Sequence, residues 1–209
     1  GQRTAIPFDF VYDTVTRNAG NILDDGNART RQFIEQGAFS ACDSLEAVRI
    51  GNIASWCEIE FENTTSNPLC FAKNLYLENE LVTELIIPEG ITNISSCAFV
   101  NCRSIESVSI PSSVKTISSG AFGHCNSLEK VYISDMASWC NISFDGASAN
   151  PLVLAGNLYL NGELVTELVI PDSVTEIGAS TFLKNADSTL ITILLIWPML
   201  PIPKDARIA

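Results

Sequence analysis

Short stretches in which apolar and polar residues alternate recur along the chain. In one of them, Val108 and Ile110 alternate with Ser107 and Ser109, which is the period-two pattern of a strand with one buried face. Pro111 follows and ends the predicted strand, because proline has no N–H to contribute to a β-ladder. A unit of this size cannot bury its apolar face alone, so it must stack on neighbours of its own kind.

These units recur at regular separations. A phenylalanine closes each unit, and the four are Phe39, Phe99, Phe122 and Phe182. The short unit between the second and the third has the length of a leucine-rich repeat, whereas the two long units are equal in length and carry an insertion. Residues 42–101 and 125–184 align without a gap, with roughly half of the positions identical. This internal repetition predicts a solenoid.

Each unit contains a pair of apolar strand positions in the same phase. We expect these pairs to form six rungs of one parallel sheet, about 4.8 Å apart. The pairs are Val48/Ile50, Leu85/Ile87, Val108/Ile110, Val131/Ile133, Leu168/Ile170 and Ile191/Ile193. The predicted fold class is an α/β solenoid, namely a right-handed leucine-rich repeat solenoid with a parallel sheet and helix-plus-hairpin insertions.

The two insertions have a predicted structure of their own. Residues 52–57 and 134–140 each read as a short helix, and the serine and aspartate that begin the second stretch are both suitable N-caps. Residues 158–165 predict a hairpin, because Asn161-Gly162 is the best two-residue sequence for a type I′ turn. We expect each helix and hairpin to lie at the side of the solenoid.

The two ends of the chain do not follow the repeat. We predict an N-terminal cap over residues 1–33, the solenoid over residues 34–193 and an apolar tail over residues 194–209. The tail either folds back over the open end of the solenoid or packs against another copy of the protein. The second interpretation predicts a homodimer that forms through residues 194–202.

Composition and charge restrict the partners. The chain has 209 residues, of which 46% are hydrophobic, and this excludes a disordered protein. Its 24 acidic and 12 basic residues give a formal charge of −12, which repels nucleic acid and anionic lipid. The apolar run near the C-terminus is too short to span a membrane and is interrupted by Pro198 and Pro201. We therefore expect no nucleic-acid partner and no membrane span.

The seven cysteines and the single histidine limit the chemistry. An odd number of cysteines cannot all pair within the chain, and a Cys97–Cys102 disulfide is the one pairing that close spacing suggests. There is no Cys-x2-Cys pair to join His124 in a zinc site, so we expect no metal and no cofactor. Cys125 occupies the same repeat position as Cys42, which indicates a buried core residue rather than a catalytic nucleophile. No Gly-x-Ser-x-Gly turn is present, and we expect no enzymatic activity.

The repeated motif reads Ser-Leu-x-x-Val-x-Ile-Pro, then Val-x-x-Ile, then Ala-Phe-x-x-Cys. It stands at residues 104–111, with Ile105 at the leucine position, and at residues 114–117 and 121–125. This motif resembles that of the BspA-like leucine-rich repeat proteins, a bacterial surface family, over about residues 34–193. The insertion, with its Trp-Cys, Asn-Pro-Leu and Leu-Tyr-Leu segments, resembles one that recurs in the same family. The resemblance implies a secreted or cell-surface protein with a role in adhesion, and we expect an export signal upstream of Gly1.

The candidate site is a surface of the predicted sheet. One outward-facing column would contain Arg49, Ile86, Ser109, Tyr132, Val169 and Thr192. A second column, two residues earlier in each strand, would contain Ala47, Glu84, Ser107, Lys130, Glu167 and Leu190. From these columns we predict a binding surface formed by Arg49, Glu84, Ser109, Lys130, Tyr132 and Glu167.

The leading hypothesis is a non-enzymatic recognition or adhesion module. Its partner would be a protein, such as a component of the host extracellular matrix or a host cell-surface protein, bound on the exposed sheet face. One alternative is a carbohydrate-binding module that uses aromatic residues of the insertions, Trp56, Tyr76, Trp139 and Tyr159. Another alternative is a structural spacer within a longer surface protein.

Overall fold

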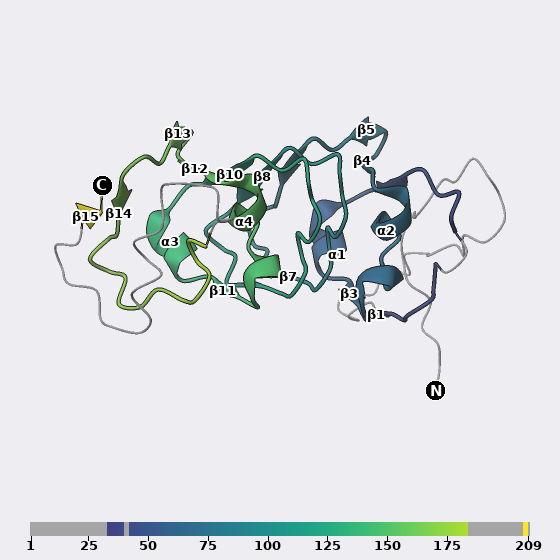
Figure 1. The fold of residues 1–209 in the computed structure, drawn as a ribbon, viewed down its shortest axis with the longest axis horizontal. Helices are drawn as coiled ribbons and strands as arrows, with labels where there is room; N and C mark the ends of the chain where they lie inside the picture. Colours follow the sequence, from purple (N-terminus) through teal and green to yellow (C-terminus); the bar gives the residue numbers. More distant parts are fainter. Residues whose placement is uncertain (1–32, 40–41, 184–206, 209) are drawn as a thin grey trace.

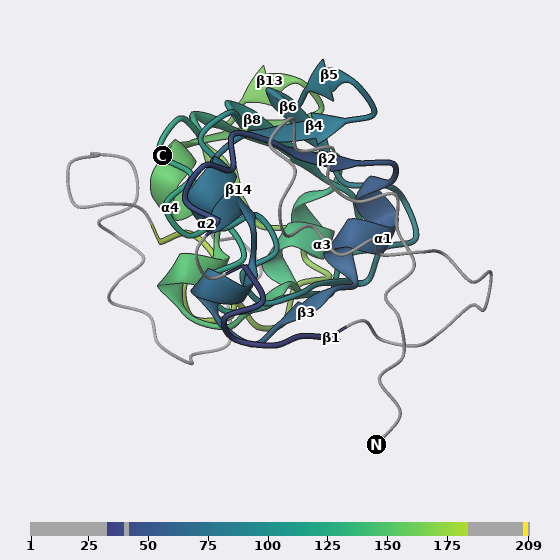
Figure 2. The same ribbon diagram turned by 90° about the vertical axis from the view of Figure 1, so that its right-hand side faces the viewer.

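Parallel strands on two sides of the molecule form the fold, and turns and short helices join them. The computed structural model describes residues 33–39, 42–183 and 207–208. The coils stack along the long axis of an elongated molecule (Figure 1). The view along that axis places β2, β4, β6 and β8 on one side, β1 and β3 on the opposite side, and the helices on the two flanks (Figure 2).

The side that carries the longer strands contains two sheets. The first sheet has the strand order β2-β4-β5, with the bounds Val48–Ile50, Leu75–Leu77 and Glu80–Leu81. The second sheet has the order β13-β12-β10-β8-β6, with the bounds Glu163–Leu164, Asn157–Leu160, Lys130–Ile133, Ser107–Ile110 and Glu84–Ile86. Strands β6, β8, β10 and β12 pair in parallel, and their central apolar residues align in the register Leu85↔Val108↔Val131↔Leu158. All four of these side chains are buried and form one layer of the core.

The predicted single parallel sheet of six rungs is wrong, because the strands of this side form two sheets and the strand that contains Leu168 joins neither of them. The first strand of each hairpin lies in the row of strands instead of at the side of the solenoid, because β4 pairs in parallel with β2 and β12 pairs in parallel with β10. Leu75 and Leu158 are buried in the same way as the leucines and valines of the predicted rungs, so these strands bury their apolar face in the common core. The inserted residues therefore form a further coil that runs from Val48 to Leu75, and the hairpin follows it.

A second row of short parallel strands lies on the opposite side. It comprises a sheet of order β11-β9-β7 and the pair β1-β3. The bounds are Ser143–Phe144, Thr116–Ile117 and Asn93–Ile94 for the sheet, and Phe33–Ile34 and Glu60–Phe61 for the pair. Ile94, Ile117 and Phe144 align in one register, and Ile34 aligns with Phe61. The apolar Val-x-x-Ile segment of the repeat thus forms a strand of its own, which the sequence analysis does not predict.

The helices recur in the two copies of the long repeat. Helices α1 and α3 cover one flank, and the 3-10 helices η1 and η2 and helices α2 and α4 follow them in each copy. Their bounds are Ile53–Cys57, Met136–Cys140, Thr64–Ser66, Ala147–Ala149, Leu69–Ala72 and Leu152–Ala155. The alignment that places Trp56 on Trp139 also places each of these elements of the first copy on its counterpart in the second.

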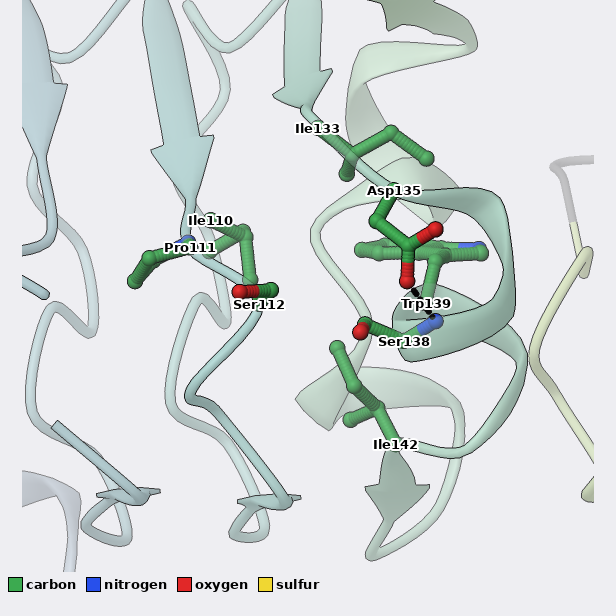
Figure 3. A pocket seen from close by; sticks show the side chains of 8 residues that line it. All are labelled: Ile110, Pro111, Ser112, Ile133, Asp135, Ser138, Trp139 and Ile142. Carbon is green, nitrogen blue, oxygen red and sulfur yellow. Dashed lines mark hydrogen bonds between the residues drawn. The ribbon is translucent and has the colours of Figure 1, made fainter. Parts of the chain in front are cut away.

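The predicted helix starts are confirmed. The Asn52 side chain caps α1 by accepting from Ala54 N and Ser55 N at 2.7 and 3.2 Å. In α3, Asp135 Oδ2 accepts from Ser138 N at 2.7 Å (Figure 3). Hydrogen bonding with Ser138 holds the pKa of the Asp135 carboxyl below its usual range.

A buried asparagine connects each inserted coil to the next coil, and in the first copy a buried tryptophan does so as well. Asn67 Nδ2 donates to the carbonyls of Cys97 and Ala98 at 2.8 and 3.0 Å, and its Oδ1 accepts from Leu69 N at 2.8 Å. Trp56 Nε1 also donates to Ala98 O, at 2.7 Å. These contacts satisfy polar groups that the core would otherwise leave unpaired. The Asn-Pro-Leu segment thus holds neighbouring coils together.

The structure describes only part of the two ends. Strand β14 (Leu168–Val169) pairs antiparallel with β15 (Arg207–Ile208) and not with β12. The predicted cap over residues 1–33 lies outside the described residues except for Phe33, and so do the sixth rung at Ile191/Ile193 and residues 194–202 of the proposed dimer contact. The three-part division of the chain and the handedness of the solenoid stay predictions. In the described part of the chain, no helix has the length and hydrophobicity needed to cross a membrane.

Candidate functional site

The exposed face of the longer-stranded side carries a row of outward-facing side chains, one from each strand. Alternate residues of a strand point to opposite faces, so the residue after each buried central position points outward. Parallel pairing aligns these residues as Ile86↔Ser109↔Tyr132↔Tyr159 in one sheet. In the other sheet, Arg49 aligns with Tyr76. We call this row, together with the hairpin leucines described below, the outer column.

Aromatic contacts link neighbours in the outer column. The guanidinium carbon of Arg49 lies 4.4 Å from the centroid of the Tyr76 ring, which is a cation–π contact. The rings of Tyr132 and Tyr159 lie with their centroids 4.9 Å apart. All four side chains are partly exposed. These contacts fix the orientation of large side chains at the surface, which lowers the entropy lost when a partner binds.

Each hairpin adds a leucine to the outer column. Tyr76 is paired with Leu81, and Tyr159 is paired with Leu164, across the antiparallel strands β4-β5 and β12-β13. The second hairpin turns at Asn161 and Gly162, whose φ values of 52° and 87° confirm the predicted type of turn. Because the two hairpins are repeat equivalents, the Tyr–Leu pair occurs twice on this face.

The exposed apolar residues concentrate on this face. Among the described residues, the exposed large apolar side chains are Phe33, Leu81, Ile86, Leu164 and Val169, with exposures of 51%, 43%, 64%, 46% and 51%. Leu81, Ile86 and Leu164 belong to the outer column, and Val169 occupies in β14 the position that Ile86 occupies in β6. Phe33 alone lies on the opposite row of strands, in β1. Large apolar side chains that are exposed together on one face of a soluble protein often belong to an interaction site.

The second predicted column is only partly exposed. Parallel pairing aligns Glu84, Ser107, Lys130 and Asn157 next to the outer column. Glu84, Lys130 and Asn157 are exposed, but Ser107 is only 8% exposed, so its predicted place on the open face is wrong. Glu167 is exposed just before β14. Of the six predicted binding residues, three lie in the outer column, namely Ser109 and Tyr132 in one sheet and Arg49 in the other. Glu84 and Lys130 lie beside the column.

The tryptophans are not available as sugar platforms. Trp56 and Trp139 are each 1% exposed and lie in the core beside Phe61 and Phe144, with ring centroids 5.4 and 5.2 Å apart. The tryptophan part of the carbohydrate hypothesis is therefore wrong, since a buried ring cannot stack on a ligand.

The cysteines are buried or half-buried thiols without disulfides. All seven are free, so the Cys97–Cys102 disulfide does not form. Burial raises the pKa of Cys57 and Cys140 to about 12 and also raises the pKa of Cys125. A thiol with a raised pKa is a poor nucleophile at neutral pH.

His124 lies in an exposed turn beside one of these buried thiols. It has a left-handed backbone with a φ of 62°, and it is exposed next to buried Cys125. The Cys125 thiol donates to the carbonyl oxygen of Phe99 at 3.0 Å in the core. No group of acidic, cysteine or histidine side chains that could hold a metal ion occurs within the described residues.

A shallow depression lies between two coils beside α3, lined by Pro111, Ile133, Asp135, Trp139 and Ile142 among others (Figure 3). Its empty volume of about 160 Å³ includes open solvent. This is well below the volume of a typical small-molecule site. The outer column, which is a surface and not a cavity, is thus the better candidate site.

Part of the outer column is not predicted from the sequence. Tyr76 and Tyr159 are expected there only as sugar platforms, and Leu81 and Leu164 are not expected at all. The signal is present in the Leu-Tyr-Leu alternation, which matches Val48-Arg49-Ile50 and indicates a strand with the same buried face. A two-residue turn after that strand places the leucine opposite the tyrosine, so the pair is predictable once the hairpin is accepted.

Comparison with known proteins gives one finding. A family model described as "BspA type Leucine rich repeat region" matches residues 70–186 in six copies, which is more than half of the chain. Neither the comparison with curated proteins nor that with solved structures gave a match. The matched range includes strands β4 to β14 and both hairpins.

Proposed function

The chain belongs to the BspA-type leucine-rich repeat family, and from this premise we propose that it is a non-enzymatic recognition module that binds a protein partner through the outer column. Repeat proteins of this kind are generally interaction modules, in which the stacked coils hold an extended surface in place. The partner that fits an adhesion role is a component of the host extracellular matrix or a host cell-surface protein. Such a role requires that the protein be secreted or attached to the cell surface.

The observation that carries the proposal is the position of the exposed apolar side chains. Ile86, Leu81 and Leu164 are exposed in register with Tyr76, Tyr132 and Tyr159 on a face made of paired strands. Tyrosine and arginine are the residue types that most often dominate binding energy at interfaces. Leaving several large apolar side chains in water on one face is unfavourable, and a partner that covers them removes this cost.

A panel of immobilised host matrix and cell-surface proteins tests the proposal by biolayer interferometry. We expect at least one member to bind the intact chain, and the triple variant Ile86→Ser, Tyr132→Ser and Leu164→Ser to bind at least about tenfold more weakly. Phe33→Ser is the matched control, because Phe33 is a comparably exposed apolar residue on the opposite row of strands. Equal loss in both variants, or no loss in the triple variant, would contradict the proposal.

Carbohydrate binding is the second candidate, and the adjacent rings of Tyr132 and Tyr159 favour it. Two partly exposed tyrosines with centroids 4.9 Å apart can stack on a sugar ring without help from the buried tryptophans. A glycan array probed with the intact chain and with Tyr159→Ser separates the two functions. Glycan binding that the substitution abolishes would favour the carbohydrate module over the protein-binding one.

A further inference from the structure

The surface on both sides of the outer column is acidic. On the side where the strands begin, exposed carboxylates come from successive coils, namely Glu46, Glu84, Glu106, Glu129 and Glu167. Among the residues whose side chains the structure describes, the cations on that side are Lys73, Arg103 and Lys130. Glu129 N donates to Glu106 O at 2.8 Å and Glu106 N donates to Thr83 O at 2.8 Å, so this rim continues from coil to coil.

The side where the strands end is more strongly acidic. Its exposed carboxylates follow the ends of β4, β6, β10 and β12: Glu78 and Glu89 lie in turns, Asp135 caps α3, and Glu80 and Glu163 lie in the hairpin strands β5 and β13. Of the described cations, Lys115 lies on this side, where its Nζ donates to Ser112 O at 3.3 Å. Its positive charge also contributes to the lowered pKa of Asp135, after the hydrogen bonds from Ser138. The carboxylates on this side therefore outnumber their counter-charges.

We propose that the outer column binds a cationic amphipathic segment of its partner, in which an apolar stripe is bordered by lysine or arginine. The apolar stripe would cover Tyr76, Ile86, Tyr132, Tyr159 and the hairpin leucines, and the basic residues would reach the two acidic rims. This inference rests on the proposed function and adds the chemistry of the partner to it. Complementary charge of this kind selects partners and raises association rates.

The same charges disfavour the other occupants of this face. A second copy of the chain would bring two acidic rims together, which costs free energy through like-charge repulsion. Nucleic acid carries the same sign of charge as the rims and would be repelled.

The repeat duplicates the residues of this surface. Tyr76, Leu81 and Glu84 at the first hairpin correspond to Tyr159, Leu164 and Glu167 at the second. A partner segment that extends along the column therefore meets the same chemistry at both hairpins.

Three synthetic helical peptides of equal length test the proposal by fluorescence anisotropy. In the first, a leucine stripe is bordered by lysines. In the second, glutamates replace the lysines, and in the third, serines replace the leucines. We expect the leucine–lysine peptide to bind at least about tenfold more tightly than either of the others, with an affinity that falls as salt rises.

Charge reversal on the protein supplies the second arm. The variant Glu84→Lys with Glu167→Lys should weaken binding of the leucine–lysine peptide by about tenfold and strengthen binding of the leucine–glutamate peptide. The matched control is Glu58→Lys with Asp145→Lys, which changes the net charge equally at exposed positions after α1 and β11. The inference would be overturned if the leucine–glutamate peptide or the serine–lysine peptide bound as tightly as the leucine–lysine peptide. It would also be overturned if the two charge reversals changed binding equally.

The two proposals fail in different ways. If Ile86→Ser, Tyr132→Ser and Leu164→Ser weaken binding of a host protein while both charge reversals leave it unchanged, the docking face stands and the cationic partner is wrong. If the apolar substitutions have no effect on any binder, the docking face itself is wrong. A concentration-dependent dimer in sedimentation that the apolar substitutions abolish would instead assign this face to a second copy of the chain.

Discussion

At the scale of single residues, buried hydrogen bonds between coils distinguish the two copies of the repeat. Trp56 Nε1 donates to Ala98 O at 2.7 Å, whereas Trp139 Nε1 is buried and has no hydrogen-bond partner among the described residues. The asparagine contacts are kept, because Asn150 Nδ2 donates to the carbonyls of Ser180 and Thr181 at 2.5 and 3.1 Å. The second copy thus lacks a hydrogen bond that the first copy makes, although the tryptophan is the same in both; Thr181 stands where the first copy has the acceptor residue Ala98.

The two tryptophans provide a matched pair for mutagenesis. Trp56→Phe and Trp139→Phe remove a similar volume from sites that are each 1% exposed. Only the first removes a formed hydrogen bond, so we expect it to lower the free energy of unfolding by about 1–2 kcal/mol more than the second. Urea denaturation of both variants measures the difference. Equal costs would show that the bond to Ala98 contributes nothing to stability.

Buried thiols predict how stability depends on pH. Burial raises the pKa of Cys57 and Cys140 from 9.0 to about 12 in the folded protein. Below pH 9 both thiols are protonated in the folded and the unfolded chain. Between pH 9 and 12 they ionise only in the unfolded chain, so the free energy of unfolding falls as pH rises, by up to about 1.4 kcal/mol per pH unit for each thiol.

Denaturation at a series of pH values checks this expectation. The double variant Cys57→Ala with Cys140→Ala should show a shallower fall between pH 9 and 11 than the unaltered chain. The two proteins differ only at these two positions, so the difference between the two slopes isolates the two thiols. An unchanged slope would mean that these thiols are not shielded from water in the native state.

At the scale of elements, the sequence predicts the strands of the longer-stranded side and helices α1 and α3, but not the opposite row of strands, helices α2 and α4, or which strand pairs with which. The alternation in Leu158-Tyr159-Leu160 indicates a strand, and Asp135 was one of the two residues expected to cap a helix; the structure confirms the strand and the cap. Local sequence does not say which strand pairs with which. Strand β4 pairs with β2 because α1, β3 and α2 form a full coil between them, and that path depends on packing that local patterns do not encode.

The hairpin turns give a prediction at this scale. Glu78 and Asn161 occupy equivalent turn positions, with φ values of 56° and 52°. Asparagine tolerates this left-handed conformation better than glutamate. Glu78→Asn should therefore raise the free energy of unfolding by about 0.5–1 kcal/mol, and Asn161→Glu should lower it by a similar amount. Thermal unfolding of both variants measures the two changes in the free energy of unfolding. If both substitutions changed it in the same direction, the assignment of strain to this turn position would be wrong.

At the scale of the whole molecule, the stacked coils separate stability from recognition. The buried positions of each strand form a continuous core, and the outward positions are free to vary in chemistry. The outer column could be predicted in part, because Arg49, Ser109 and Tyr132 follow from alternation alone. Tyr76, Tyr159 and the hairpin leucines required knowledge that the hairpins join the same face. The burial of Ser107 also depended on neighbouring side chains that alternation does not describe.

Side-chain footprinting with hydroxyl radicals, with and without a bound host protein, tests the docking face most directly. Tyrosine, leucine and isoleucine side chains react with these radicals when they are exposed, and a partner that covers them lowers the rate. We predict slower oxidation of Tyr76, Ile86, Tyr132 and Tyr159 in the complex, with no change at Phe33. Protection of Phe33 and the β7-β9-β11 side, with the tyrosines unchanged, would contradict the account.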